Sequence, residues 1–423
     1  MPNISFPYGK ESLSYAIPQE RFAGELVSEL HHFKPSKTEA ELVRDAIANP
    51  IGSRPLSELA KGKKNIVLIA SDHTRPVPSK VIVPPLLGEI RRGSPDADIT
   101  ILIATGCHRE TTREELENKF GPEIMKNEKI IVHDCDTSEF SDLGTLPSGG
   151  SLIVNRLAAE ADLLIAEGFI EPHFFAGFSG GPKSVLPGIV SRKTVVYNHN
   201  AEFIAHPSAR TGIIEGNPIQ TDMQYAAQKA GLAFICNVVI NSAKQVIYAA
   251  AGACGPAHKA GREFLLSKSR VKSVPADIVI STNGGYPLDQ NIYQAVKGMS
   301  AAEATVNRDG VIIMLSKSND GHGGPEFHRT FKEEKDLDRM LADFMKTPKD
   351  NTRIDQWQSQ IFARVLKRAK VIYVSEAPDE IVSDLHMIPA RSIEEAVKKA
   401  GEILGNPNAK IAAIPDGVSV IVC

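Results

Sequence analysis

Short apolar runs alternate with amphipathic stretches along almost the whole chain, and this alternation constrains the fold more than any other feature. Four runs have the length and composition of buried strands: 64–72, 97–106, 129–136 and 161–168. Helical spacing separates them at 79–92 and 111–126, where Thr111 and Thr112 begin a plausible capped helix. The alternation predicts an α/β fold with largely parallel, Rossmann-like sheets, whose ligands lie beyond the carboxyl ends of the strands.

A second block of the same kind begins near Val271. Residues 275–290 resemble a strand followed by a polar turn, and residues 290–307 have a long helical pattern. Further strands are expected at 310–316, 370–376 and 410–423. The Lys-, Ser- and Pro-containing stretch 267–275 marks the boundary. We therefore predict two α/β domains, residues 1–270 and 271–423, with the active site in the cleft between them. The last strand could instead return to the first domain.

The segment 167–200 is unusually rich in glycine and directly follows a predicted strand. Its glycines surround one basic side chain, Lys183, and they are Gly177, Gly180, Gly181 and Gly188. Glycines let backbone N–H groups approach an anion closely, so the segment predicts a site for a phosphorylated group. The alternative is a structural turn with surface histidines, His173 and His199.

Known phosphate-binding loops do not match this segment. A Walker loop requires glycine directly before its lysine, but Pro182 stands between Gly181 and Lys183. The spacing G-x-G-x-x-G of dinucleotide-binding loops is also absent. The bound group is therefore not expected to be a nucleoside triphosphate.

Three polar motifs follow predicted strands and should meet at one edge of the sheet. They are SDHTRPVPS, with Asp72, Thr74 and Arg75; ATGCHRE, with His108; and the loop with His173. Histidine titrates near neutrality and suits proton transfer, and arginine suits a carboxylate. The alternatives are hydrogen-bonded loop histidines and ordinary surface charge.

Four long motifs closely resemble the lactate racemase family of nickel-pincer enzymes. They are HFFAGFSGGPKSVLPGI, SDHTRPVPS, ATGCHRE and STNGGYPLDQNIYQAVKGM, and the resemblance extends through essentially the whole chain. It implies a nickel-pincer nucleotide, a pyridinium mononucleotide linked covalently to Lys183, with His199 as the protein's nickel ligand. The cofactor-binding residues would further include Asp72, Thr74, Gly177, Gly180 and Gly181. Many relatives carry a basic residue at the place of Pro182, so one phosphate contact is not matched here.

The same resemblance implies that His108 and His173 form the acid–base pair on opposite faces of the substrate. Substrate-binding residues would be Arg75, Tyr293, Gln294, Lys297 and Trp357. Tyr293 and Lys297 are four residues apart, and therefore neighbours on a helix. Trp357, the only tryptophan, could equally be a core residue. His322 and the cysteines are interpreted as structural.

Composition narrows the environment and the partners. The charge of −3 favours neither nucleic acid nor a membrane surface as a partner, and no apolar run reaches membrane-spanning length. The N-terminus lacks the pattern of a signal peptide. The five cysteines are scattered without a C-x-x-C motif, which suits a reducing compartment. We therefore predict a cytoplasmic protein.

These features together predict an isomerase that racemises or epimerises a small 2-hydroxy acid at C2, with lactate as the first candidate. By resemblance, the reaction would be a hydride transfer, and cofactor-biosynthesis enzymes would be partners in maturation. Alternative substrates are malate, phenyllactate, 2-hydroxybutyrate or a sugar acid. Two other classes remain open: a non-catalytic nucleotide-binding protein and a metal-dependent hydro-lyase.

Overall fold

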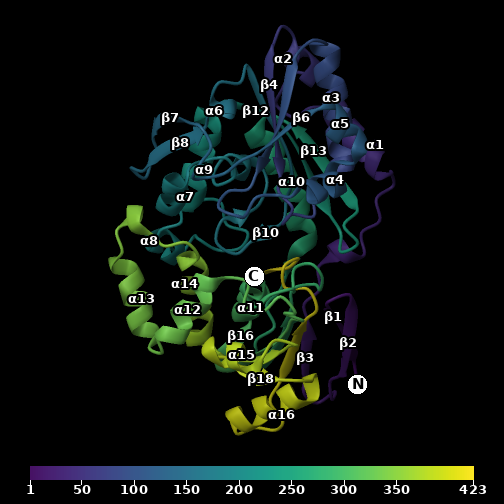
Figure 1. Ribbon diagram of the computed structural model, residues 1–423. Helices are drawn as coiled ribbons and strands as arrows, with labels where there is room; N and C mark the ends of the chain where they lie inside the picture. Colours follow the sequence, from purple (N-terminus) through teal and green to yellow (C-terminus); the bar gives the residue numbers. More distant parts are fainter. The chain divides into compact units, whose positions relative to one another are not determined.

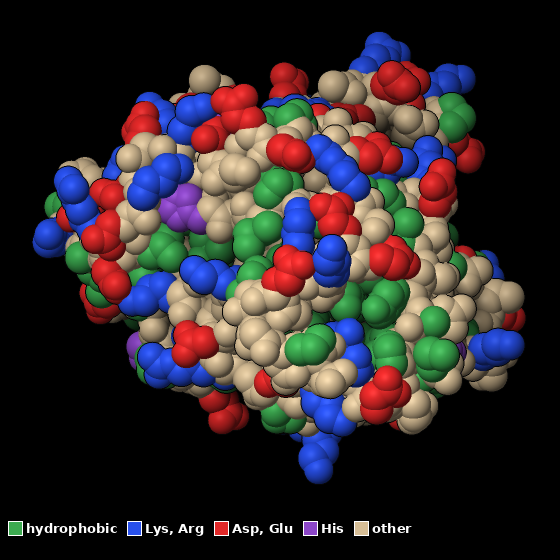
Figure 2. All heavy atoms as spheres, turned by 90° about the horizontal axis from the view of Figure 1, so that it is seen from below, with side chains coloured by type: hydrophobic (Ala, Val, Ile, Leu, Met, Phe, Trp, Pro, Cys, Tyr) green, Lys and Arg blue, Asp and Glu red, His purple; other side chains and the backbone are tan.

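The computed structural model describes residues 1–423 and divides into two compact units (Figure 1). The N-terminal unit comprises Leu30–His199 and His206–Ser267. The C-terminal unit comprises Met1–Glu29, Asn200–Ala205 and Lys268–Cys423. None of the helices is both long and apolar enough to span a bilayer. On the face drawn in Figure 2, acidic and basic side chains are intermixed.

The N-terminal unit is built on a six-stranded sheet of order β13-β12-β9-β4-β5-β6. Its strands are β4 (Asn65–Ser71), β5 (Asp98–Ala104), β6 (Lys129–Val132), β9 (Leu163–Phe169), β12 (Leu232–Ile240) and β13 (Val246–Gly252). All neighbours are parallel except β12 and β13, which are antiparallel. Every residue of β9 is buried, as expected for a parallel strand covered on both faces. The predicted α/β fold with parallel sheets is confirmed.

Five helices bury apolar side chains against one face of this sheet. They are α1 (Glu39–Ala48), α2 (Leu56–Ala60), α3 (Ser79–Gly93), α4 (Arg113–Phe120) and α5 (Pro122–Asn127). The capped start predicted over Thr111–Glu114 is found one residue further on, since Thr112 is the N-cap of α4 and forms a capping box with Glu115. The helix expected over 111–126 is divided, because Gly121 has φ 82° and Pro122 begins α5.

The rest of the N-terminal unit consists of short strands and of helices. It contains the antiparallel pair β7 (Phe140–Thr145) and β8 (Ser151–Asn155), then α6 (Arg156–Ala159), β10 (Pro172–His173), β11 (Gly177–Phe178), η2 (Gly181–Ser184), α7 (Arg192–Asn198), α9 (Pro218–Lys229) and most of α10 (Cys254–Ser269). The β7–β8 pair has no counterpart in the sequence-based prediction.

The C-terminal unit has a second six-stranded sheet, of order β18-β17-β16-β15-β19-β3, with all neighbours parallel. Its strands are β3 (Phe22–Glu25), β15 (Ala276–Thr282), β16 (Val306–Leu315), β17 (Lys370–Val374), β18 (Ile388–Ala390) and β19 (Ile411–Ile414). Its helices are η1 (Glu29–His31) in part, α8 (Ala201–Ala205), α11 (Ile292–Glu303), α12 (Pro325–Glu333), α13 (Leu337–Lys346), η3 (Lys349–Asn351), α14 (Gln356–Arg368), α15 (Asp379–Asp384) and α16 (Ile393–Leu404).

The N-terminal segment packs with the C-terminal sheet, which differs from the predicted continuous domain of residues 1–270. The hairpin of β1 (Asn3–Tyr8) and β2 (Glu11–Ala16) buries Ile4, Phe6 and Tyr8 in the core of the C-terminal unit. Strand β3 then pairs with β19. The closing strand β20 (Ile421–Val422) pairs with β14 (Arg270–Val271), so the end of the chain stays in the C-terminal unit.

Candidate active site

Three polar loops leave the same edge of the N-terminal sheet. Strand β4 lies between β9 and β5, and all three run parallel. Their carboxyl ends therefore share one edge, and Asp72, His108 and His173 follow the ends of β4, β5 and β9 respectively. The loop after β5 also contacts the glycine-rich segment, because the Gly106 N–H donates to the Gly188 carbonyl at 3.0 Å. The predicted convergence of these motifs is consistent with this topology.

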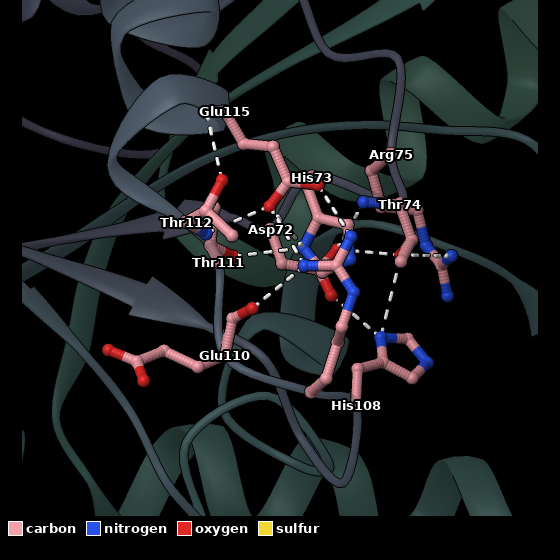
Figure 3. A network of polar contacts seen from close by, with 10 residues as sticks. Asp72, His73, Thr74, Arg75, His108, Glu110, Thr111, Thr112 and Glu115 are labelled. Atoms are coloured by element: carbon pink, nitrogen blue, oxygen red, sulfur yellow. Dashed lines mark hydrogen bonds and ion pairs between the residues drawn. The ribbon is translucent and has the colours of Figure 1, made fainter.

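Asp72 and His108 form a close carboxylate–imidazole pair (Figure 3). His108 Nδ1 lies 2.6 Å from Asp72 Oδ2, and Asp72 is buried. Burial raises the pKa of Asp72, but the hydrogen bond and charge of His108 outweigh it and hold the pKa well below its usual range. The carboxylate can only accept, so Nδ1 carries the proton that they share. In the neutral ring, His108 Nε2 is therefore a proton acceptor.

The second oxygen of Asp72 organises the turn that follows β4. Thr74 Oγ1 donates to Asp72 Oδ1 at 2.7 Å, and Arg75 Nη1 donates to Thr74 Oγ1 at 2.9 Å. This chain of bonds uses one of the five N–H donors of Arg75. A partly exposed guanidinium with donors remaining beside the Asp72–His108 pair is suited to an incoming carboxylate.

A second group of contacts holds the loop that carries His108 (Figure 3). Arg109 binds both carboxylate oxygens of Glu115, at 2.9 and 2.5 Å, and His73 Nδ1 lies 3.0 Å from Thr111 Oγ1. The hydrogen bond from Arg109 lowers the pKa of Glu115 to about 2. Sequence reasoning missed this support, although Glu115 was recognisable as the third residue of a capped helix.

The glycine-rich segment packs tightly against other parts of the N-terminal unit. Gly177, Gly180 and Gly181 all have positive φ. A Cβ at Gly177 would lie 2.2 Å from the Ile213 carbonyl oxygen, and one at Gly181 would lie 2.6 Å from the His258 ring. These glycines are therefore needed for close packing and backbone conformation.

One N–H of the expected anion site is already engaged. The Gly181 N–H donates to Asn237 Oδ1 at 2.7 Å, inside the protein. Phosphate binding by this segment stays a prediction, and in this conformation it would rest on N–H groups other than that of Gly181.

Three of the predicted residues surround the ring of Phe175. Its centroid lies 5.8 Å from Lys183 Nζ, and the ring centroids of His199 and His173 lie 5.3 and 4.5 Å away. His173 is buried, and its Nδ1 accepts a hydrogen bond from the Ala176 N–H at 3.2 Å. In the neutral ring, His173 Nε2 therefore carries the proton, which is the opposite tautomer to His108.

His199 has the features of a metal ligand. It caps the end of α7, and its Nδ1 donates to the Val195 carbonyl at 3.1 Å, so in the neutral ring Nε2 is the nitrogen that carries the lone pair. Burial and the nearby charge of Lys183 lower the pKa of His199 to about 3. The ring is thus neutral at physiological pH, as nickel binding requires.

These features fit the implied cofactor at two points, a primary amine at Lys183 and a neutral imidazole at His199. No group of three or more His, Cys, Asp or Glu side chains is arranged to hold a metal ion.

The remaining predicted residues belong to the C-terminal unit. Tyr293, Gln294 and Lys297 lie on α11, whose first turn is capped by Asn291 Oδ1 accepting from the Gln294 N–H at 3.0 Å. Trp357 lies in the first turn of α14, which packs against α11. The Tyr293 hydroxyl donates to Asp355 Oδ1 at 3.0 Å. A site formed jointly by the two units stays a prediction.

Sequence comparison matches two long stretches of the chain to known families. Residues 8–212 match the family described as lactate racemase N-terminal domain, and residues 271–422 match the lactate racemase C-terminal domain. The lactate racemase of Thermoanaerobacterium thermosaccharolyticum is 53% identical over 424 residues, covering 100% of this chain and 99% of that protein. The lactate racemase of Lactiplantibacillus plantarum is 51% identical, with 100% of both chains covered.

Structural comparison gives the same result. The lactate racemase apoprotein from Thermoanaerobacterium thermosaccharolyticum superimposes with a TM-score of 0.96 at 52% identity, covering 100% of both chains. A Thermotoga maritima protein shares the fold with a TM-score of 0.67 at 18% identity, covering 91% of this chain and 98% of that one.

Proposed function

This chain belongs to the lactate racemase family and is a racemase, and we propose that it interconverts the two enantiomers of lactate at a site built around a tethered nickel-pincer nucleotide. The observation that carries the proposal is the pair of histidines with complementary ring nitrogens. His108 offers an acceptor Nε2 and His173 a donor Nε2, and both follow carboxyl ends of the same sheet.

The two histidines act on the oxygen of the substrate. His108 Nε2 takes the hydroxyl proton, and the buried Asp72 carboxylate stabilises the imidazolium that forms. His173 Nε2–H donates to the substrate oxygen on the other face. Because the reaction runs in both directions, the His108 imidazolium returns in one direction the proton that it accepts in the other. His173 can exchange a proton in the same way as an imidazolium, once its Nδ1 no longer accepts from the Ala176 N–H.

Lys183 and His199 would hold the cofactor, the first through its amine and the second through Nε2. When bound, the pincer nucleotide supplies an electron-poor centre that accepts the C2 hydride and returns it. The packing of His173, His199 and Lys183 around the Phe175 ring supports this arrangement, because it keeps the three side chains close together.

Arg75 and Lys297 would bind the substrate carboxylate. The single variants Arg75→Ala and Lys297→Ala should each reduce kcat/KM by about tenfold to a hundredfold, since a hydrogen bond to a charged group contributes roughly 1.5–3 kcal/mol. Steady-state kinetics measure this loss, and the larger part is expected in KM. A variant with wild-type kcat and KM would show that its residue does not bind the substrate. The exposed Lys193→Ala serves as a matched charge-removal control.

Chiral product analysis tests the function directly. Protein produced together with the cofactor-making enzymes is incubated with L-lactate alone and then with D-lactate alone. Each is expected to give the same near-equal mixture of enantiomers. A nucleotide-binding protein would leave both unchanged, and a hydro-lyase would give an absorbing enoate. The same assay with malate, phenyllactate, 2-hydroxybutyrate and sugar acids decides among substrates.

A further inference from the structure

A single residue with a strained backbone joins two of the helices that carry predicted substrate-binding residues. Asp355 has φ 65° and ψ 0°, the left-handed region that a non-glycine residue enters only at a cost. It stands at the N-cap of α14, two residues before Trp357. An aspartate at this position ordinarily caps the helix with its carboxylate, but this one makes no such bond.

The carboxylate of Asp355 is directed at Tyr293 instead. Its Oδ1 accepts a hydrogen bond from the Tyr293 hydroxyl at 3.0 Å, across 62 positions of the sequence. The Asp355 carboxylate therefore forms a tertiary contact with Tyr293 in place of a cap on α14. A strained residue persists only where its surroundings determine its conformation, and such residues concentrate at functional sites.

Other contacts fix the same tyrosine and the same turn. The Gln358 side chain donates to the Tyr293 carbonyl, and the Phe327 ring meets the Tyr293 ring edge-on at 5.6 Å. Gly324 packs closely against both residues, since a Cβ there would lie 3.0 Å from the Tyr293 ring and 3.3 Å from Asp355 Oδ2. The Tyr293 ring and the start of α14 thus form one interlocked group.

We propose that Asp355 is a positioning residue, which orients the Tyr293 hydroxyl and the first turn of α14 at Trp357 for substrate binding. The inference rests on the proposed function for the roles of Tyr293 and Trp357. Asp355 acts through these neighbours and does not itself touch the reacting atoms.

Substitution at Asp355 can separate the hydrogen bond from the backbone strain. Asp355→Gly removes the carboxylate but favours the left-handed conformation, so the relief of backbone strain should offset part of the stability lost with the hydrogen bond, and the variant should stay folded. Its kcat/KM should fall by about tenfold to a hundredfold, mainly through KM. Asp355→Asn keeps an acceptor oxygen and tolerates the same φ, and it should stay within about fivefold of wild type.

Tyr293→Phe removes the other partner of the bond. The double variant Tyr293→Phe/Asp355→Gly should be about as active as the less active of the two single variants. The losses should not add, because both changes delete the same hydrogen bond. The matched control is Asp309→Gly. Asp309 is exposed and has φ 61°, so this change relieves the same kind of strain elsewhere and should leave kinetics unchanged.

Trp357 provides a readout that does not depend on activity. It is the only tryptophan of the chain, so fluorescence of the protein excited at the indole band reports on this turn alone. Asp355→Gly and Tyr293→Phe should shift its emission, whereas Asp309→Gly should not.

Wild-type kinetics and wild-type emission in Asp355→Gly, or strictly additive losses in the double variant, would overturn the proposal. Failure of the wild type to racemise any 2-hydroxy acid would defeat the proposed function instead, and the emission result would still decide the positioning role.

Discussion

Replacement of Lys183 by alanine is expected to abolish both the covalent modification of the protein and its racemase activity. Lys183 is the only lysine between Gly177 and Gly188, and its ammonium lies close enough to His199 to lower the pKa of that ring. If a nickel-pincer nucleotide is bound, Lys183 would hold it through its amine and His199 would serve as the protein's nickel ligand. Intact mass of protein made with the cofactor-producing enzymes should exceed the sequence mass by one mononucleotide, and Lys183→Ala should show the sequence mass alone.

Two control variants separate attachment from metal binding. Lys193→Ala, ten residues along, should retain the added mass and the activity, since its side chain is exposed on α7. His199→Ala should retain the organic addition but lose nickel, by more than the roughly 10–100-fold loss in affinity typical of residues that only support a metal ligand. Added mass that survives in Lys183→Ala would place the attachment elsewhere, and equal nickel in His199→Ala would remove His199 as the ligand.

The parallel strands were predictable because burial on both faces leaves a simple signature. Strand β9 is apolar except for Glu167 and is buried throughout, and β4 and β5 are similar. From strand order alone, the motifs that begin at Asp72, Gly106 and Gly168 could be assigned to one edge. This explains why Asp72 and His108, distant in sequence, were expected to lie together before their 2.6 Å contact was known.

What could not be predicted depends on partners that are distant along the chain. The alternation of buried Ile4, Phe6 and Tyr8 with polar residues indicates a strand, but not that its core includes Ile278 and Ile280. The glycine-rich segment showed a similar limit. Its composition suggested space for an anion, whereas Ile213, Asn237 and His258 occupy much of the space around the glycines.

The supporting residues of the site were missed for the same reason. Nothing near Asp355 in sequence indicates that its carboxylate contacts Tyr293 or that its φ is positive. Likewise, the Arg109–Glu115 pair is formed by a turn whose shape depends on the capped start of α4. Local patterns identify the chemistry of a site, while the contacts that orient its side chains come from tertiary structure.

Replacement of either His108 or His173 is expected to cause a large loss of racemase activity, second only to that of Lys183→Ala. His108→Gln and His173→Gln should each lower kcat by about 10²–10⁴, the usual contribution of positioned acid–base catalysis. Nickel content and covalent mass should stay at wild-type values, because neither ring is the proposed ligand or attachment point. Asp72→Asn should resemble His108→Gln, since it removes the carboxylate that stabilises the His108 imidazolium. Unchanged kcat in either histidine variant would exclude that residue from proton transfer.

Deuterium at C2 then shows which hydrogen the histidines move. The C2–H of a 2-hydroxy carboxylate is a very weak acid, and acid–base assistance of about 10²–10⁴ is too small to remove it as a proton at a useful rate. The hydroxyl proton is far easier to take, so His108 and His173 should act on oxygen while the C2 hydrogen leaves with its electron pair. Lactate deuterated at C2 should therefore react more slowly, and in ordinary water its product of opposite configuration should keep the label. Product that has lost deuterium to solvent would mean that a histidine abstracts the C2 proton. Such a result would leave the Asp72–His108 pair as a catalytic base and remove the need for a hydride acceptor at Lys183.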